Sequence, residues 1–168
     1  MMLEVAIDTD SEWDSSHSWE KLVRTAAEAA IAQSAFPNLA AAERTVELSV
    51  RLTDDEEVRA LNAEWRGKDR PTNVLSFPLA EADDLQSADV AGPELLLGDI
   101  VLAHGVCRAE AAAKGISVED HAAHLVVHGT LHLLGFDHHD DGEAADMEAR
   151  EVRALELMGI ANPYEAAA

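Results

Sequence analysis

Hydrophobic and polar residues alternate in two segments of the chain, and this period of two predicts β-strands with one buried face. The alternation covers residues 3–7 and, more regularly, residues 46–52. Two further apolar runs are predicted as strands: residues 74–77, which end at Pro78, and residues 95–102. The pattern therefore predicts about four strands.

Elsewhere apolar residues recur every three or four positions, which is the period of a helix with one buried face. Thr53, with Glu56 three residues later, predicts a capping box at the start of one helix, and Ser117 is predicted to cap another. Gly115 and Gly159 lie where two of the helices are predicted to end. The predicted helices cover residues 18–31, 53–65, 103–114, 117–132 and 140–158.

These strands and helices are interleaved along the chain, and no internal repeat or linker divides it. The sequence therefore predicts one α+β domain over residues 1–168, with a mixed sheet of about four strands and about five helices. Residues 80–94 are acidic, contain no cation and include Gly92 and Pro93. We therefore expect a surface loop there.

The cysteine content and the N-terminus indicate a reducing compartment. Cys107 is the only cysteine, so no disulfide can form within the chain, and its apolar neighbours predict a buried side chain. No apolar run is long enough to cross a membrane. Residues 1–8 lack the cationic and apolar segments of a signal peptide. We expect a cytoplasmic protein with no membrane partner.

The net charge of −21 argues against nucleic-acid binding, because contacts to phosphate need cations. However, four of the twelve basic residues lie close together in the sequence: Arg59, Arg66, Lys68 and Arg70. The last three belong to residues 66–73, which contain too many helix- and strand-breaking residues for regular structure. The chain has either a solvated acidic surface with an incidental basic patch or a cationic cleft on an acidic body, and charge alone leaves both open.

Residues 128–138, His-Gly-Thr-Leu-His-Leu-Leu-Gly-Phe-Asp-His, carry the clearest chemical signal. His128 and His132 are four residues apart, so on a helix their side chains lie on one face. Gly135 lies where this helix is predicted to end, because glycine adopts the left-handed conformation without a steric penalty. The resulting turn can bring His138 toward the same point. Three convergent imidazoles predict a catalytic zinc site with one open position, carried by a zincin-like helix.

A neighbouring histidine, His124, also lies four residues from His128, but it is about 12 Å along the helix axis from His132. His124 and His132 therefore cannot both bind one ion at zinc–nitrogen distances of about 2 Å. Of the two possible pairs, only His128 and His132 precede the glycine turn. His124 is therefore interpreted as a residue behind the ligands, a substrate-facing residue or part of the helix surface. Three neutral imidazoles also suit Ni²⁺, Cu²⁺ or Co²⁺, so we predict one divalent metal per chain, zinc in the first place.

The spacing matches the long metzincin signature H-E-x-x-H-x-x-G-x-x-H, except that Gly129 stands where the protease has its glutamate base. The sequence thus predicts the metal site without the peptidase base. Asp137 is predicted to orient the turn or a ligand imidazole, because a carboxylate behind a metal ligand commonly fixes the histidine tautomer.

The same residues resemble the hallmark of the YbeY family of bacterial metal-dependent endoribonucleases, H-G-x-x-H-L-x-G-[YF]-D-H, with Phe136 at the aromatic position. Residues 65–78 are similar to the family's block R-x-K-x-x-T-[DN]-V-L-S-F-P, and residues 97–100, Leu-Gly-Asp-Ile, form a third match in the family's order. The strong negative charge and the acidic segment 80–94 are departures to which the resemblance assigns no role.

The resemblance implies that His128, His132 and His138 hold zinc and that Arg66 lies in the cleft and is needed for activity. It also implies a single-strand-specific endoribonuclease of ribosomal RNA, acting in 3′-end maturation of small-subunit RNA and in ribosome quality control. A guanidinium suits a phosphate oxygen because it donates two hydrogen bonds at once. The substrate contacts are predicted to be Lys68, Arg70 and His124. Without the resemblance, Arg66 is better explained as a loop cation paired with a surface carboxylate.

Two other functions stay open on the sequence alone. A zincin-like metallohydrolase of another class, such as a peptidase or amidase, would need its base from Asp99 or Asp137, because Gly129 cannot supply it. A non-catalytic ribosome-assembly factor with a structural zinc would need a fourth protein ligand, often a cysteine, and nothing in the spacing links Cys107 to the three histidines.

The distribution of charge predicts weak capture of free RNA, since only a few cations near residues 66–70 can neutralise phosphates. We therefore expect the small ribosomal subunit or a basic ribosomal protein to be the partner that brings the enzyme to its RNA. An acidic surface on this chain would then meet a basic one.

Overall fold

The four predicted strands form one mixed sheet in the computed structural model, which describes residues 2–13, 18–36, 39, 44–86, 94–137 and 140–164. The strands lie in the order β1-β2-β4-β3, in which β1, β2 and β4 run parallel and β3 pairs antiparallel with β4. Strand β3 is therefore an edge strand, and it borders the site described below. Their bounds are β1 Met2–Thr9, β2 Thr45–Thr53, β3 Val74–Pro78 and β4 Leu95–Ala103.

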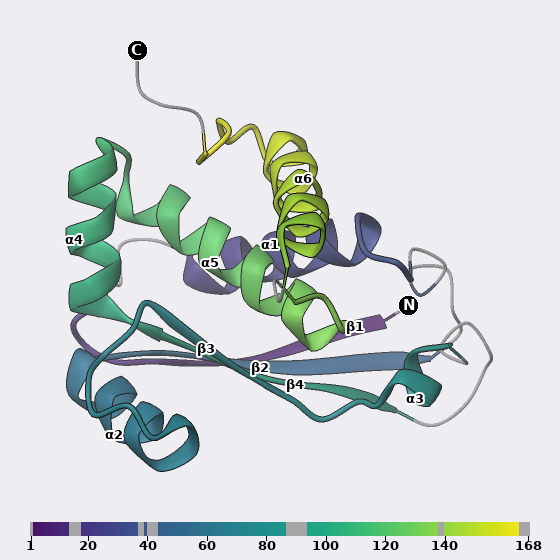
Figure 1. Ribbon diagram of the computed structural model, residues 1–168, viewed down its shortest axis with the longest axis horizontal. Helices are drawn as coiled ribbons and strands as arrows, with labels where there is room; N and C mark the ends of the chain where they lie inside the picture. The colour runs from purple at the N-terminus through teal and green to yellow at the C-terminus, as the bar shows by residue number, and fades with distance from the viewer. Residues whose placement is uncertain are drawn as a thin grey trace.

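Helices cover the two faces of this sheet unequally. Figure 1 shows α1, α5 and α6 on one face and α2 on the other. The main core lies between the sheet and α1, α5 and α6, and a smaller cluster, Val58, Leu75, Val101 and Ala103, lies under α2. The helix bounds are α1 Trp19–Ala32, α2 Asp55–Arg66, α3 Ala82–Gln86, α4 His104–Lys114, α5 Val118–Leu133 and α6 Asp141–Leu157.

This architecture confirms the predicted α+β class with a four-stranded mixed sheet. The described residues contain six helices rather than about five, because α3 lies in the segment that was predicted as a loop. The loop prediction was wrong at this point: Leu85 of α3 is buried in the main core, which gives the short helix an anchor. Residues 87–93 of the same segment lie outside the described residues.

The predicted capping box of Thr53 and Glu56 was also wrong. Thr53 is the last residue of β2 and pairs with Ala103, so the chain leaves the sheet one residue later than predicted. Asp54 caps α2 instead, and its side chain accepts a hydrogen bond from the backbone N–H of Glu57 at 2.8 Å. The sheet pairing therefore moved the cap by one position.

Two other local predictions are confirmed, the cap at Ser117 and the burial of Cys107. Ser117 caps α5 and accepts from the N–H of Asp120 at 3.1 Å, and Asp140 caps α6. Cys107 is buried, and burial raises the pKa of its thiol to about 12. Within the described residues, none of the helices has the length and apolar character needed to cross a membrane.

Candidate metal centre and its cleft

Helix α5 carries the predicted metal ligands and packs closely on the sheet at Gly129. A Cβ atom built at this glycine would lie 3.0 Å from Cγ2 and 3.2 Å from Cδ1 of Ile100 in β4. Side chains at position 129 thus point at the sheet, and a glutamate there would have to displace Ile100. The position where the protease carries its glutamate base is therefore occupied by a glycine that packs against the sheet.

The chain turns back after α5 in the way that Gly135 predicts. Gly135 has a φ of 92°, its N–H donates to the carbonyl of His132, and the N–H of Phe136 donates to the carbonyl of Leu131, both at 3.0 Å. This pair of bonds is the Schellman arrangement that ends many helices. The turn brings the Phe136 carbonyl within 2.8 Å of Nδ1 of His132.

The hydrogen bonds of His128 and His132 determine which ring nitrogens carry a proton. A carbonyl oxygen only accepts, so Nδ1 of His132 must donate to Phe136. Likewise Nδ1 of His128 donates to Oε1 of Glu151 at 2.5 Å. In the neutral rings both Nε2 atoms therefore present lone pairs.

These two Nε2 atoms face each other at 3.0 Å. A proton shared between the two rings makes this contact a hydrogen bond, and a metal cation in its place would be attracted by both lone pairs. Two zinc–nitrogen bonds of about 2.0–2.1 Å at a tetrahedral angle would place the nitrogens about 3.3 Å apart, close to the observed distance. The donor set of His128 and His132 therefore fits a divalent metal.

The third predicted ligand, His138, lies outside the described residues. Among the side chains that the structure does describe, no group of three His, Cys, Asp or Glu residues could hold a metal ion. Asp137 lines the cleft beside His128 and His132. The roles of His138 and Asp137 therefore stay predictions.

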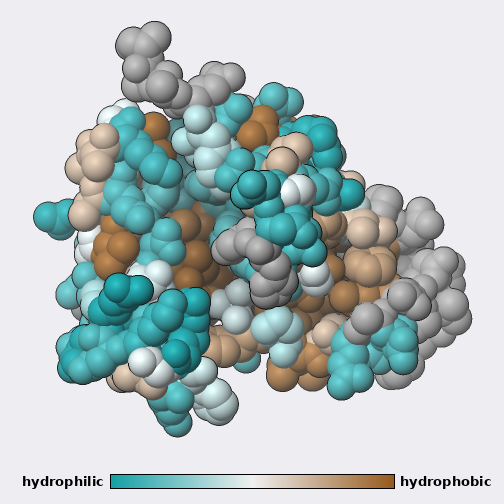
Figure 2. Space-filling model, in the orientation of Figure 1, coloured by the Kyte–Doolittle hydropathy of each residue, from teal (hydrophilic) through white to brown (hydrophobic). Residues whose placement is uncertain are grey.

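A cleft of about 540 Å³ opens in front of the two histidines. Arg66, the last residue of α2, lines it together with His128 and His132, and its predicted role in the reaction stays a prediction. Figure 2 shows hydrophobic side chains between the hydrophilic surfaces of α2 and of the helices above it. The other cleft residues come mainly from β3 and its approach: Trp65, Thr72, Asn73, Val74, Leu75, Ser76, Phe77 and Asp137.

The remaining predicted substrate contacts do not line this cleft. Lys68 and Arg70 follow Arg66 in the turn after α2, where the N–H of Lys68 bonds the carbonyl of Asn62. His124 is only 6% exposed, and its Nε2 lies 3.2 Å from the Tyr164 hydroxyl. This placement favours the interpretation of His124 as a residue behind the ligands over substrate contact.

Sequence reasoning missed two residues of the site. Trp65 is 65% exposed at the cleft, and its ring lies edge-on to Phe77 with 6.3 Å between centroids. Glu151 is fully buried and bonds His128. A signal for Glu151 was available: it lies four residues from both Met147 and Leu155, on the apolar stripe of α6.

The carboxyl group of Glu151 is ionised despite its burial. Burial alone would raise the pKa of Glu151, but the neighbouring His124, His128 and Tyr164 outweigh it and lower this pKa to about 2. A buried carboxylate is tolerated only when such partners satisfy it. Glu151 thus places a fixed negative charge directly behind His128.

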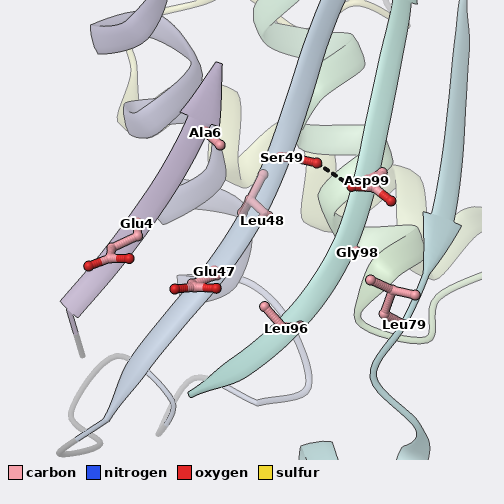
Figure 3. Close-up of a pocket in the computed structure, with 9 residues that line it drawn as sticks. All are labelled: Glu4, Ala6, Glu47, Leu48, Ser49, Leu79, Leu96, Gly98 and Asp99. Atoms are coloured by element: carbon pink, nitrogen blue, oxygen red, sulfur yellow. Dashed lines mark hydrogen bonds between the residues drawn. The ribbon is translucent and has the colours of Figure 1, made fainter. Parts of the chain in front are cut away.

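The other face of the sheet has a separate, acidic character. A smaller pocket of about 240 Å³ is lined by Glu4 and Glu47 from neighbouring strands and by Asp99, which accepts a hydrogen bond from Ser49 (Figure 3). The hydrogen bond with Glu4, then burial and the charge of Glu94, raise the pKa of Glu47. Because Ile100 faces α5, Asp99 points to the opposite side of the sheet and cannot serve as a base at the metal centre.

Comparison with known proteins gives a consistent match over nearly the whole chain. A family model described as Endoribonuclease YbeY matches residues 6–159. A protein named Endoribonuclease YbeY from Rhizorhabdus wittichii is 49% identical over 164 residues, which is 97% of each chain. Another of that name, from Sphingopyxis alaskensis, is 52% identical over 164 residues, covering 97% of this chain and 98% of the other.

A solved structure shares the fold. The solution structure of TM1509 from Thermotoga maritima superposes with a TM-score of 0.55 at 22% identity, covering 93% of this chain and 92% of that one. At this identity the likeness concerns the arrangement of strands and helices alone.

Proposed function

This chain belongs to the endoribonuclease YbeY family, enzymes that hydrolyse phosphodiester bonds of RNA, and from that premise we propose that the cleft between α5 and β3 is its active site. The observation that carries the proposal is the pair of Nε2 atoms of His128 and His132, which face each other at 3.0 Å in the same cleft as Arg66. His138 would complete the ligand set from the turn after α5.

A zinc ion bound by the three histidines would lower the pKa of a water molecule to about 7 and polarise a phosphoryl oxygen. Zinc is favoured because neutral imidazoles with one open position are its usual catalytic ligands, although nickel and cobalt accept the same set. The protein's own part is to hold the phosphate: the Arg66 guanidinium can donate two hydrogen bonds to its oxygens and offset the charge that builds there.

Single-stranded RNA is the proposed form of the substrate. Bases that are not stacked in a helix can stack on exposed aromatic rings, and Trp65 with Phe77 offers such a ring beside Arg66. Lys68 and Arg70 would extend the path of the backbone past Arg66.

We further propose that the RNA is ribosomal, cut at the 3′ end of the small-subunit RNA during maturation and quality control in the cytoplasm. The net charge of −21 leaves few cations to hold free RNA. The acidic open face of the sheet, with Glu4, Glu47 and Asp99, would instead suit a basic ribosomal protein (Figure 3).

Two observations count against a peptidase or amidase. Position 129 is filled by packing against Ile100, and Asp99 lies on the far face of the sheet. Of the alternative bases that the sequence offered, only Asp137 lies at the cleft. A purely structural zinc is disfavoured because His128 and His132 line an open cleft and Cys107 is buried elsewhere.

The proposal is tested by incubating the purified protein, freed of metal and then reloaded with zinc, with an end-labelled single-stranded RNA. The same RNA annealed to its complement serves as the matched substrate control. We expect cleavage of the single strand, little cleavage of the duplex and loss of both with a chelator. A zinc-loaded wild type that cuts neither RNA contradicts the proposal.

The ribosomal partner has a test of its own. With three or four cations available, the slope of log affinity for naked RNA against log salt should be about −2 to −3. Binding to small ribosomal subunits should be tighter at the same salt concentration. Tight, steeply salt-dependent binding to naked RNA without preference for subunits would contradict the partner proposal and leave the active site untouched.

A further inference from the structure

A connected chain of hydrogen bonds lies behind His128, formed by residues that the proposed reaction does not use. We propose that Glu151 is a positioning residue, which holds His128 in the tautomer that binds metal, and that the Tyr164 hydroxyl holds Glu151 in place. The inference rests on the proposed metal site, although its central claim concerns the metal-free protein.

The surroundings of Glu151 leave its carboxylate little freedom. The side chain is 0% exposed, in the core between α6 and α5. Its Oε1 accepts from Nδ1 of His128 at 2.5 Å, and its Oε2 accepts from the hydroxyl of Tyr164. Both oxygens are therefore bonded, and to move either one would leave a buried charge short of a partner, which is strongly destabilising.

This arrangement selects one tautomer of His128. A neutral imidazole carries one proton, on Nδ1 or on Nε2, and in water both forms are populated. A carboxylate can only accept, so Glu151 keeps the proton on Nδ1 and leaves the lone pair of Nε2 facing His132 in the cleft. The competing tautomer would place a proton where a metal must bind.

Tyr164 fixes the other end of the chain. Its hydroxyl donates to Glu151 and accepts from Nε2 of His124 at 3.2 Å, so the oxygen is held from two sides. With its proton on Nε2, His124 has a bare Nδ1, and that buried atom has no partner among the described residues. His124 thus acts behind the ligands, through Tyr164 and Glu151, which accounts for its burial away from the cleft.

A merely structural role is the competing explanation. Glu151 also links α6 to α5, and any buried ion pair that loses a partner destabilises a fold. A structural role predicts lower stability with unchanged zinc affinity and an unchanged tautomer in those molecules that stay folded. A positioning role predicts changes in both.

The first measurement is the zinc affinity of folded protein, by competition with a chromophoric chelator. Removal of a carboxylate behind a metal ligand typically weakens binding 10–100-fold, so we expect the Kd of Glu151→Ala to rise by about that factor. Glu151→Gln should lose less, because its amide oxygen still accepts from Nδ1. Glu156→Gln, which removes the same charge from the exposed side of α6, is the matched control and should bind as the wild type does.

Tyr164→Phe removes a single oxygen atom and should weaken zinc binding at the lower end of the same range. It also covers the case in which Glu151→Ala fails to fold. Wild-type affinity in both Glu151→Gln and Tyr164→Phe would overturn the proposal.

The second measurement needs no metal. Long-range ¹⁵N–¹H correlations of the imidazole rings report which nitrogen of His128 carries the proton. We expect the Nδ1–H form in the wild type and in Glu156→Gln, and a mixture of tautomers in Glu151→Ala. Glu151→Gln should show a smaller share of the Nε2–H form, because its amide can present either its oxygen or its NH2 group to Nδ1. An unchanged Nδ1–H form in the two Glu151 variants overturns the inference, whereas a wild type with this tautomer that binds no zinc counts against the proposed function alone.

Discussion

Helix α5 carries two pairs of histidines, His121 with His124 three residues apart and His128 with His132 four residues apart. In its N-terminal half, His121 and His124 are 1% and 6% exposed. In its C-terminal half, the side chain of His128 is 24% exposed, and His132 lines the same cleft. The two halves differ in what covers the helix, and among the described residues of α5 only the second half presents imidazoles to this cleft.

The covered pair is bonded to side chains from neighbouring segments. Nε2 of His121 lies 2.9 Å from Glu110 of α4, and Nε2 of His124 lies 3.2 Å from the hydroxyl of Tyr164. The open pair has its Nδ1 atoms engaged instead, which turns both Nε2 atoms toward the cleft and toward each other. A histidine becomes a ligand when its partners bind the nitrogen that faces away from the metal.

The largest effect should be on RNA cleavage, and it should distinguish the open pair, His128 and His132, from the covered pair, His121 and His124. His128→Ala and His132→Ala should each lower RNA cleavage by about 10²–10⁴-fold, the range for losing a group that activates the nucleophile. His121→Gln should retain the wild-type rate per folded, zinc-loaded molecule, since it lies outside the cleft. Equal losses in both halves of α5, measured after metal content is matched, would break the comparison.

Arg66 should matter nearly as much, because it lines the same cleft as the open pair, His128 and His132. Removal of one donor to a developing anion typically lowers kcat by about 10²–10³-fold, and we expect Arg66→Ala to fall in that range. Arg59 of the same helix is paired with Glu56 and Asp69. Arg59→Ala is therefore the matched control. Similar rates for the two variants in single-turnover cleavage would remove Arg66 from the proposed reaction.

The packing of α5 against the sheet can be tested by a substitution at Gly129. A methyl group there would press on Ile100 at 3.0 Å, and overpacking of this kind destabilises by about 1–3 kcal/mol, against a gain of about 1 kcal/mol in helix propensity. We expect Gly129→Ala to lower the free energy of unfolding in denaturant titrations. In an Ile100→Ala background the same change should become neutral or stabilising. Identical effects in the two backgrounds would mean that the contact with Ile100 is not the cause.

The smallest effect should appear in the pH dependence of stability, through the covered pair. Burial lowers the pKa of His121 below its ordinary 6.5. The hydrogen bond to Glu110 and the charge of Glu110 oppose this change only in part. The unfolded chain therefore takes up this proton at a higher pH than the folded protein. Stability from neutral His121 is present above about pH 6.5 and is lost as the pH falls below that value.

Thermal unfolding of the metal-free protein checks this sign. From about pH 7.5 down to about pH 5 the Tm of the wild type should fall. The fall should be shallower in His121→Gln, because the unfolded variant lacks the imidazole that takes up a proton in this pH range. Parallel curves for the two proteins would show that His121 has its ordinary pKa in the fold.

Periodicity was sufficient to predict the strands and the long helices, because each buries one continuous face. It failed where contacts distant in sequence decide local structure. Pairing of Thr53 with Ala103 moved the cap of α2 to Asp54, and burial of Leu85 stabilised a helix within an acidic segment. These contacts join segments that no window of the sequence contains.

The site shows the same division. His128 and His132 were predicted because a pair on one helix and a glycine turn are local features. Glu151 and Tyr164 lie 23 and 36 residues beyond His128 and reach it only through the packing of α6. The interpretation of His124 stayed open for this reason: its partner lies 40 residues away.

The contact between Gly129 and Ile100 also constrains how such a helix can change over evolutionary time. A glutamate at position 129 would restore the metzincin signature, but its Cβ atom would lie 3.0 Å from the Ile100 side chain, which would have to shift by a few tenths of an ångström. A lineage that acquired the glutamate first would therefore carry the cost of overpacking until position 100 changed. A lineage that first acquired a smaller residue at position 100 would instead carry the cost of a cavity. Packing between α5 and β4 thus makes the effect of either mutation depend on whether the other is already present.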